Sequence, residues 1–171
     1  LFVALPGKRV DGHDYVEEAF RRGANLALVQ KDLSARLSCV DVRNGKLPES
    51  LPEAPFCLWV EDTLKAFQAI AGFWRRKLNI RVVGITGSVG KSTTKELIYE
   101  VLSQRYHTLK SPGNLNNEIG LPLTVLRTQG DTRFLLLEMG ARGIGHIAEL
   151  SAIAPPDISV VLNVGVAHLG E

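Results

Sequence analysis

The chain has 171 residues, and its 20 lysines and arginines almost balance its 18 aspartates and glutamates, which leaves a formal net charge of +2. This balance gives no sign of a nucleic-acid partner, and no apolar stretch is long enough to cross a bilayer. The length suffices for one medium or two small domains, and the two cysteines, Cys39 and Cys57, are expected to be buried thiols of an intracellular protein.

The first half of the chain alternates short apolar runs with helical patterns, which predicts a small α/β domain. Strands are predicted at residues 1–5, 26–29, 38–42 and 56–60, and helices at residues 15–22 and 64–77. Residues 44–55 are rich in proline, glycine and glutamate and are predicted to form a loop. A domain boundary is predicted near Asn79, so that residues 1–79 and 80–171 belong to separate domains.

The helices of this half carry recognisable signals at their ends. Asp14 is predicted to cap the first helix, and Asp62 or Thr63 is predicted to cap the second. The loop around His13 is interpreted as structural rather than catalytic. The basic run at residues 75–77 is interpreted as a solvated helix end that the helix dipole favours.

The second half shows the same alternation, which predicts a mostly parallel sheet with helices packed on it. Strands are predicted at residues 81–85, 106–109, 134–139 and 158–163, and helices at residues 95–102, 121–126 and 146–152. The runs at 134–139 and 158–163 are apolar almost throughout, and both strands are predicted to be buried.

A glycine-rich turn at residues 84–94 lies between a predicted strand and a predicted helix. Such a turn cradles phosphate, because backbone N–H groups and the helix N-terminus point at the anion, and Lys91 adds a full positive charge. Ser92 is placed to bring its hydroxyl to a phosphate-bound Mg²⁺. The common pattern has glycine at the position of Ile85, so this loop is a variant. The alternative is a glycine-rich turn with a surface lysine.

Polar side chains follow the other predicted strands of this half. Asn114, Asn116 and Asn117 follow the second strand, Glu138 ends the third and His168 follows the fourth. Because parallel strands share one carboxyl edge, where ligands bind, these side chains should converge beside the glycine-rich turn. Glu138 is then placed as a Mg²⁺ ligand. The alternatives are a surface carboxylate, a solvated histidine and asparagines that cap the next helix.

Four segments of the second half together resemble the Mur ligases, ATP-dependent enzymes that form amide bonds in peptidoglycan precursor synthesis. The segments are residues 84–96, 113–124, 138–147 and 163–169, and residues 1–5 and 11–13 resemble the N-terminal domain of that family. The resemblance implies that residues 1–79 are part of a UDP-substrate-binding α/β domain and residues 80–171 part of a P-loop-type ATP-binding domain. Within the family, the chain is similar to the ligases that join D-Ala-D-Ala to UDP-N-acetylmuramoyl-tripeptide through an acyl phosphate, with release of ADP and phosphate.

The resemblance also implies ATP and Mg²⁺ as cofactors and gives the site residues their roles. The implied phosphate-binding residues are Gly87, Ser88, Val89, Gly90, Lys91, Ser92 and Thr93, the catalytic residues Lys91 and His168, the metal ligands Ser92, Glu138 and His168, and the substrate-side residues Asn116 and Asn117. The expected location is the cytoplasm, without membrane insertion or a nucleic-acid partner. The oligomeric state is open, with a monomer as the expectation.

Both ends of the sequence are interpreted as cut, so the chain is expected to be a fragment that does not catalyse ligation alone. The resemblance places a carbamoylated metal-site lysine shortly after Glu171, followed by a C-terminal domain that contacts adenine and the amino substrate. Two other functions are considered: a Mur-type ligase that adds the third peptide residue, and an ATP-binding regulatory module without ligation. The segments at 114–117 and 138–143 argue against the first of these.

Overall fold

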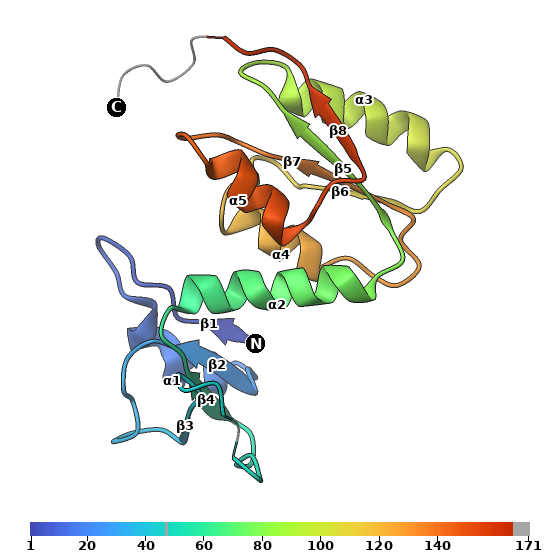
Figure 1. Cartoon of the computed structure of the whole chain (residues 1–171). Coiled ribbons are helices and arrows are strands. Elements are labelled where there is room, and N and C mark those ends of the chain that lie inside the picture. The colour runs from blue at the N-terminus through green and yellow to red at the C-terminus, as the bar shows by residue number, and fades with distance from the viewer. Residues whose placement is uncertain (47, 166–171) are drawn as a thin grey trace. The chain divides into compact units, whose positions relative to one another are not determined.

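The computed structural model describes residues 1–46 and 48–165 of the chain. The chain forms two compact units, Leu1–Phe67 and the residues from Gln68 onward, which divide within helix α2 (Thr63–Lys77). Each unit has a four-stranded sheet whose neighbouring strands are all parallel. The predicted α/β fold class is therefore confirmed (Figure 1). The domain boundary near Asn79 stays a prediction about the whole protein.

The first unit orders its strands β1, β2, β4, β3 across the sheet. Its elements are β1 (Phe2–Val3), the 3-10 helix η1 (Gly12–Tyr15), α1 (Val16–Arg21), β2 (Leu26–Val29), β3 (Cys39–Asp41) and β4 (Phe56–Trp59). Ala27, Val29 and Cys57 are fully buried in the core that these elements enclose. Cys39 and Cys57 are both free thiols; Cys57 is buried, as predicted, but Cys39 is only half-buried. Burial raises the pKa of the Cys57 thiol to about 12.

The predicted cap of the first helix is wrong, because Asp14 lies inside the 3-10 helix that precedes α1. Asp11 is the cap, and its Oδ1 accepts the His13 N–H at 2.9 Å. His13 is buried, with Nδ1 2.5 Å from Asp11 Oδ1 and with Nε2 accepting the Gln30 N–H at 2.9 Å. Nδ1 therefore holds the ring within its own loop, and Nε2 ties the loop to the residue that follows β2, in agreement with the structural interpretation.

The second unit places β5 and β7 at the centre of a sheet ordered β6, β7, β5, β8. Its elements are β5 (Arg81–Thr86), α3 (Lys91–Ser103), β6 (Thr108–Lys110), α4 (Gly120–Leu126), β7 (Phe134–Glu138), α5 (His146–Ile153) and β8 (Ile158–Val161). Every predicted strand and helix of this half has a counterpart, although α3 begins earlier, at Lys91. The carboxyl ends of the four parallel strands share one edge of the sheet.

Alternate residues of the two central strands face two separate cores. Val82 and Leu137 pack with apolar residues of α4, α5 and the C-terminal part of α2. Val83 and Leu136 lie on the other face and pack against α3. Figure 1 shows α3 on one side of the sheet and α4 with α5 on the other. This three-layer packing holds the start of α3 next to the carboxyl ends of β5 and β7.

Two predictions about exposure are wrong. The strand predicted as buried at 158–163 is an edge strand, with Ile158 and Val161 51% and 63% exposed, because only β5 pairs with it among the described strands. In the basic run, Arg75 is not solvated. Its guanidinium bonds the carbonyls of Leu78 and Ile80, each at 3.4 Å, because the chain turns back past the helix end.

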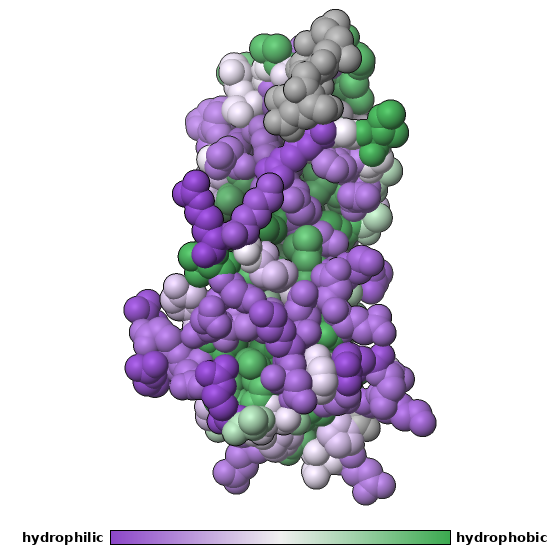
Figure 2. Space-filling model, turned by 90° about the vertical axis from the view of Figure 1, so that its left-hand side faces the viewer, coloured by the Kyte–Doolittle hydropathy of each residue, from purple (hydrophilic) through white to green (hydrophobic). Residues whose placement is uncertain are grey.

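Hydrophilic residues cover most of the face shown in Figure 2. Among residues 1–46 and 48–165, no helix combines the length and apolarity that a membrane crossing needs.

Asp157 joins the end of α2 to the start of β5, and its charge should make stability depend on pH. The Val82 N–H donates to its carboxylate at 2.8 Å, and Arg81 and Arg75 lie at 3.1 and 3.3 Å, so its pKa is held below the ordinary value despite partial burial. A lowered folded-state pKa adds stability above the unfolded-state pKa, and this stability is lost as pH falls through the folded-state pKa.

Asp157→Asn should therefore lower the free energy of unfolding at pH 7 by about 1 kcal/mol or less, since water reaches these ion pairs. The free energy of unfolding should also fall less steeply than in the parent below about pH 4. Urea unfolding between pH 7 and pH 3 measures both effects. Glu100→Gln, at an exposed carboxylate of α3, is the control. Parallel pH curves for Asp157→Asn and the parent would show that the Asp157 charge adds nothing.

Candidate functional site

The glycine-rich turn follows β5 directly and needs glycine for two separate reasons. Gly87 has φ +141°, and a Cβ built there would meet Leu162 Cβ at 3.1 Å and the Asn163 nitrogen at 3.2 Å. Gly90 has φ +89° and is the left-handed residue from which α3 starts. Ile85, where the common pattern has glycine, is a fully buried strand residue of the sheet. The loop itself is therefore Gly87–Gly90. The pattern lacks a glycine at position 85 because a buried side chain packs there in the sheet.

Helix α3 begins at Lys91 without a side-chain cap. Among the described residues, no side chain caps its first N–H groups, which leaves these groups available to an anion. Lys91, Ser92 and Thr93 form this first turn, so Lys91 is a helix residue and half-buried rather than an exposed loop residue. Its Nζ donates to the carbonyl oxygens of Gly87 and Ser88, at 2.7 and 3.4 Å. The ammonium is thus folded onto the loop that it follows.

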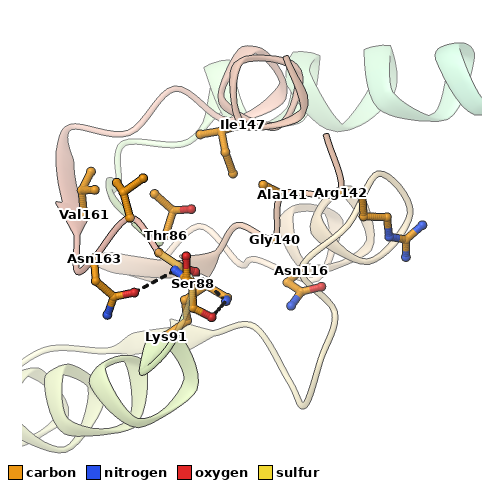
Figure 3. A pocket seen from close by; sticks show the side chains of 12 residues that line it. Thr86, Ser88, Lys91, Asn116, Gly140, Ala141, Arg142, Ile147, Val161 and Asn163 are labelled. Atoms are coloured by element: carbon orange, nitrogen blue, oxygen red, sulfur yellow. Dashed lines mark hydrogen bonds between the residues drawn. The ribbon is translucent and has the colours of Figure 1, made fainter. Parts of the chain in front are cut away.

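Asn163, just past β8, fastens the same loop from the other side (Figure 3). Its Oδ1 accepts the N–H groups of Ser88 and Val89, each at 3.0 Å, and its Nδ2 donates to the Val89 carbonyl at 3.0 Å. Sequence reasoning gave Asn163 no role. The available signal was its position at the end of the apolar strand predicted at residues 158–163, the same kind of signal that identified Glu138.

Glu138, the last residue of β7, is brought next to the loop as predicted. The Glu138 side chain is 4% exposed. Its Oε2 accepts the Ser92 hydroxyl at 2.8 Å, and its Oε1 accepts the Asn116 amide N–H at 2.9 Å. Burial raises its pKa, but the hydrogen bonds from Asn116 and Ser92, with the nearby Lys95 ammonium, outweigh burial and hold the pKa below the ordinary value. Glu138 is therefore not a surface carboxylate, and it is charged at neutral pH.

Lys95 is a member of this cluster that sequence reasoning missed. Its side chain is 2% exposed, and its Nζ lies 3.5 Å from Glu138 Oε2 and 3.2 Å from the Gly113 carbonyl oxygen. The signal was its spacing, since Lys95 follows Lys91 and Ser92 by one helical turn and shares their face of α3. The Ser111 hydroxyl is a second missed contact and accepts the Glu138 N–H at 3.2 Å.

The three asparagines of the polar turn separate into different environments. The Asn116 side-chain amide donates to the Glu138 carboxylate, and the Asn116 backbone carbonyl accepts the Gly140 N–H at 2.8 Å. Asn117 Oδ1 accepts the N–H groups of Ile119 and Gly120 at 3.2 and 2.8 Å, so Asn117 caps the start of α4. Asn114 is exposed. A substrate-side role for Asn116 and Asn117 stays a prediction.

A cavity of about 480 Å³ opens beside the loop at the carboxyl edge of the sheet. The loop and Lys91 form one wall, and Asn116, Gly140 and Arg142 form another. Figure 3 shows these groups with Ile147 of α5 above them. A volume of this size, lined by backbone amides, a lysine and amide side chains, suits a phosphorylated ligand.

The donor atoms at the loop fit a hard divalent cation such as Mg²⁺. The Ser92 hydroxyl and the Glu138 carboxylate are 2.8 Å apart, and Mg²⁺ prefers oxygen ligands. Within residues 1–46 and 48–165 there is no group of three or more histidine, cysteine or acidic side chains that could enclose a metal ion. Such an ion would therefore keep water or phosphate ligands as well. His168, the third predicted ligand, lies outside the described residues.

The parallel sheet, the glycine loop and the uncapped helix start are together the features of an α/β domain that binds the phosphates of a nucleotide. Comparison with protein-family models finds the Mur ligase family catalytic domain at residues 1–75 and the Mur ligase middle domain at residues 85–171. The chain belongs to the Mur ligase family, which confirms the resemblance seen in the sequence.

Individual relatives are similar over the whole chain. The curated UDP-N-acetylmuramoyl-tripeptide–D-alanyl-D-alanine ligases of Synechocystis sp. and Bacillus subtilis are 43% and 40% identical to it, over 99% and 100% of its length. The crystal structure of MurF from Acinetobacter baumannii has a TM-score of 0.81 at 33% identity over 99% of the chain. That of MurF ligase from Thermotoga maritima, in complex with ADP, has a TM-score of 0.80 at 40% identity over 98%.

The chain spans about a third of the length of these relatives, 34% of both curated proteins and 34% and 35% of the two solved chains.

Gly87→Ala should strain the loop, because alanine at φ +141° also meets the backbone of Asn163. We expect a loss of about 1–3 kcal/mol in the free energy of unfolding and weaker binding of ADP. Gly130→Ala is the matched control, since nothing lies within 4 Å of its Cβ position. Urea unfolding and titration calorimetry with ADP measure the two effects. An alanine variant at 87 that matches the control in both would contradict the strain argument.

Proposed function

We propose that the whole protein that carries this chain is an ATP-dependent ligase that joins D-Ala-D-Ala to UDP-N-acetylmuramoyl-tripeptide. The observation that carries the proposal is the contact between Ser92, at the start of α3, and the buried Glu138 beside a glycine loop. The names of the relatives from Synechocystis sp. and Bacillus subtilis support the choice of substrates. The complex of the Thermotoga maritima relative with ADP supports the nucleotide.

The proposed reaction has two steps. The terminal carboxylate of the tripeptide attacks the γ-phosphorus of ATP, which gives an acyl phosphate and releases ADP. The amine of D-Ala-D-Ala then attacks the acyl carbon and loses a proton, and phosphate leaves as the amide bond forms. Most of the catalytic demand is the stabilisation of charge on the transferred phosphoryl group.

The loop and the first turn of α3 would hold the phosphates of ATP. The N–H groups of Gly87–Thr93 supply donors, and Lys91 supplies a positive charge once its Nζ exchanges the carbonyl oxygens of Gly87 and Ser88 for phosphate oxygens. We assign Lys91 as a catalytic residue on this basis. A phosphate that used the Ser88 and Val89 amides would also displace the Asn163 side chain.

Ser92 and Glu138 would hold Mg²⁺ by their hydroxyl and carboxylate oxygens. When bound, Mg²⁺ neutralises charge on the phosphoryl oxygens. Asn116 is hydrogen-bonded to Glu138 and lines the cavity, so its amide can orient the carboxylate and also face the substrate. We assign Asn117 to the same side and His168 to catalysis and a second metal position, both from the family resemblance.

We further propose that the protein acts in the cytoplasm as a monomer. Both cysteines are free, which is usual in a reducing compartment, and the nucleotide and UDP-linked substrates are soluble intracellular compounds.

A substrate panel on the whole protein tests the proposed activity. We expect phosphate release when ATP, UDP-N-acetylmuramoyl-tripeptide and D-Ala-D-Ala are all present. We expect none when either the UDP-linked tripeptide or D-Ala-D-Ala is left out. Lys91→Ala should reduce turnover by about a thousandfold or more, because the phosphates lose a fixed positive charge, while the unfolding curve stays close to that of the parent.

Two other results would replace the proposal. Turnover with a free third-position amino acid and none with D-Ala-D-Ala would identify a Mur-type ligase that adds the third residue. ATP hydrolysis or conformational change that is independent of both ligase substrates would identify a regulatory module.

Glu138→Ala should raise the Mg²⁺ concentration needed for half-maximal activity by about tenfold or more, because the site loses its carboxylate. The measurement is initial rate against Mg²⁺ at saturating substrates. Glu118→Ala is the control, since that carboxylate contacts the exposed Arg142 instead. An unchanged Mg²⁺ curve for Glu138→Ala would mean that the Glu138 carboxylate does not hold the metal.

A further inference from the structure

Lys95 is the largest fully buried side chain in the part of the chain that the structure describes. A buried ammonium is costly unless charged or hydrogen-bonded partners compensate it. Its Nζ lies 3.2 Å from the Gly113 carbonyl, 3.5 Å from Glu138 Oε2 and 3.9 Å from Glu96 Oε1. The nucleotide-binding role proposed for α3 does not use this group.

The charge of Lys95 is directed at Glu138. Of the described side chains that contact the Glu138 carboxylate, Ser92 and Asn116 are neutral and Lys95 alone is charged. Glu96 is half-exposed and pairs with Lys110 on its solvent side. The buried pair is therefore Lys95 with Glu138, and the Gly113 carbonyl connects it to the turn that carries Asn116.

A fixed positive charge at this position has opposite effects on the two ligands of the site. It attracts the phosphates of a nucleotide, and it repels a divalent cation that approaches Glu138. Because the surroundings are buried, water and salt screen both effects less than at the surface. A cation is then held best when the phosphates arrive with it.

We propose that Lys95 is a positioning residue that serves as the built-in countercharge of Glu138: it fixes the carboxylate and the Gly113 turn, disfavours a free divalent cation and favours the nucleotide phosphates. The inference rests on the proposed function in one respect, since it takes Ser92 and Glu138 as metal ligands. It adds an order of binding, in which metal enters together with nucleotide.

The test uses the whole protein and two separate titrations, Mn²⁺ without nucleotide, followed by electron paramagnetic resonance, and ADP without metal, followed by calorimetry. Lys95→Met should bind Mn²⁺ about tenfold more tightly than the parent and metal-free ADP several-fold more weakly. Lys110→Met is the matched control, because this lysine pairs with Glu96 and not with Glu138, and it should change neither value. Adding Glu138→Ala to Lys95→Met should abolish the gain in Mn²⁺ affinity.

Effects of opposite sign on the two ligands separate an electrostatic role from a packing role. A lysine that only supports the fold would, when replaced, weaken both ligands or neither, and either result overturns the inference. A gain in Mn²⁺ affinity that survives Glu138→Ala overturns it as well, because the metal would then be bound elsewhere. If the substrate panel shows no turnover with D-Ala-D-Ala, the proposed ligase activity is wrong, but the results of these two titrations are unaffected.

A second set of variants distinguishes loss of the Lys95 charge from a general folding defect. Lys95→Gln removes the charge and keeps a donor for the Gly113 carbonyl, so it answers the same question if Lys95→Met does not fold. In urea unfolding, Lys95→Met should destabilise the parent and stabilise the Glu138→Gln variant, where the lysine has lost its carboxylate partner. The same sign in both backgrounds would contradict the pairing.

Discussion

The buried charge of Glu138 is the constraint on which the rest of the site depends. A carboxylate on a side chain that is 4% exposed, at the end of a strand, is stable only when hydrogen-bond donors or cations surround it. Those donors come from two further segments: Ser92 and Lys95 from α3, and Asn116 from the turn after β6. The contacts that neutralise the carboxylate therefore also fix where α3 begins relative to β7, and so where the glycine loop lies.

The glycine loop depends on the same packing from the other side. Ile85 fills the sheet between β7 and β8, so the chain can turn only after Thr86, and Gly87 must pass close to the backbone of Asn163. A side chain at Gly87 would push the loop away from β8, and the Asn163 bonds to the Ser88 and Val89 amides would lengthen. The variant spacing of glycines thus follows from the sheet and not from the ligand.

The sequence was sufficient for the sheets and for the convergence of Ser92, Asn116 and Glu138, because strand–helix alternation implies parallel strands with a common carboxyl edge. It was insufficient for Lys95, since the partner that explains its burial is 43 residues away and a lysine on a helix is ordinarily solvated. The exposure of β8 was missed for a related reason: an apolar run indicates a strand, but its place at the edge depends on the order of strands. The wrong cap, Asp14, came from an unrecognised 3-10 turn.

Most polar side chains of the site, and two amides of the loop, are already hydrogen-bonded to one another. Lys91 donates to loop carbonyls, Asn163 accepts two loop amides, and Glu138 accepts Ser92 and Asn116. At these groups, binding of phosphate and metal is an exchange of partners, so the net gain per contact is small. The uncapped first N–H groups of α3 are different, because no side chain of the described residues caps them. The electrostatic contribution of the charged groups to the binding free energy is not cancelled by such an exchange. Lys91 and the α3 N-terminus favour an anion at the loop, while Lys95 already balances Glu138, which makes the phosphates the source of the negative charge that a cation needs here.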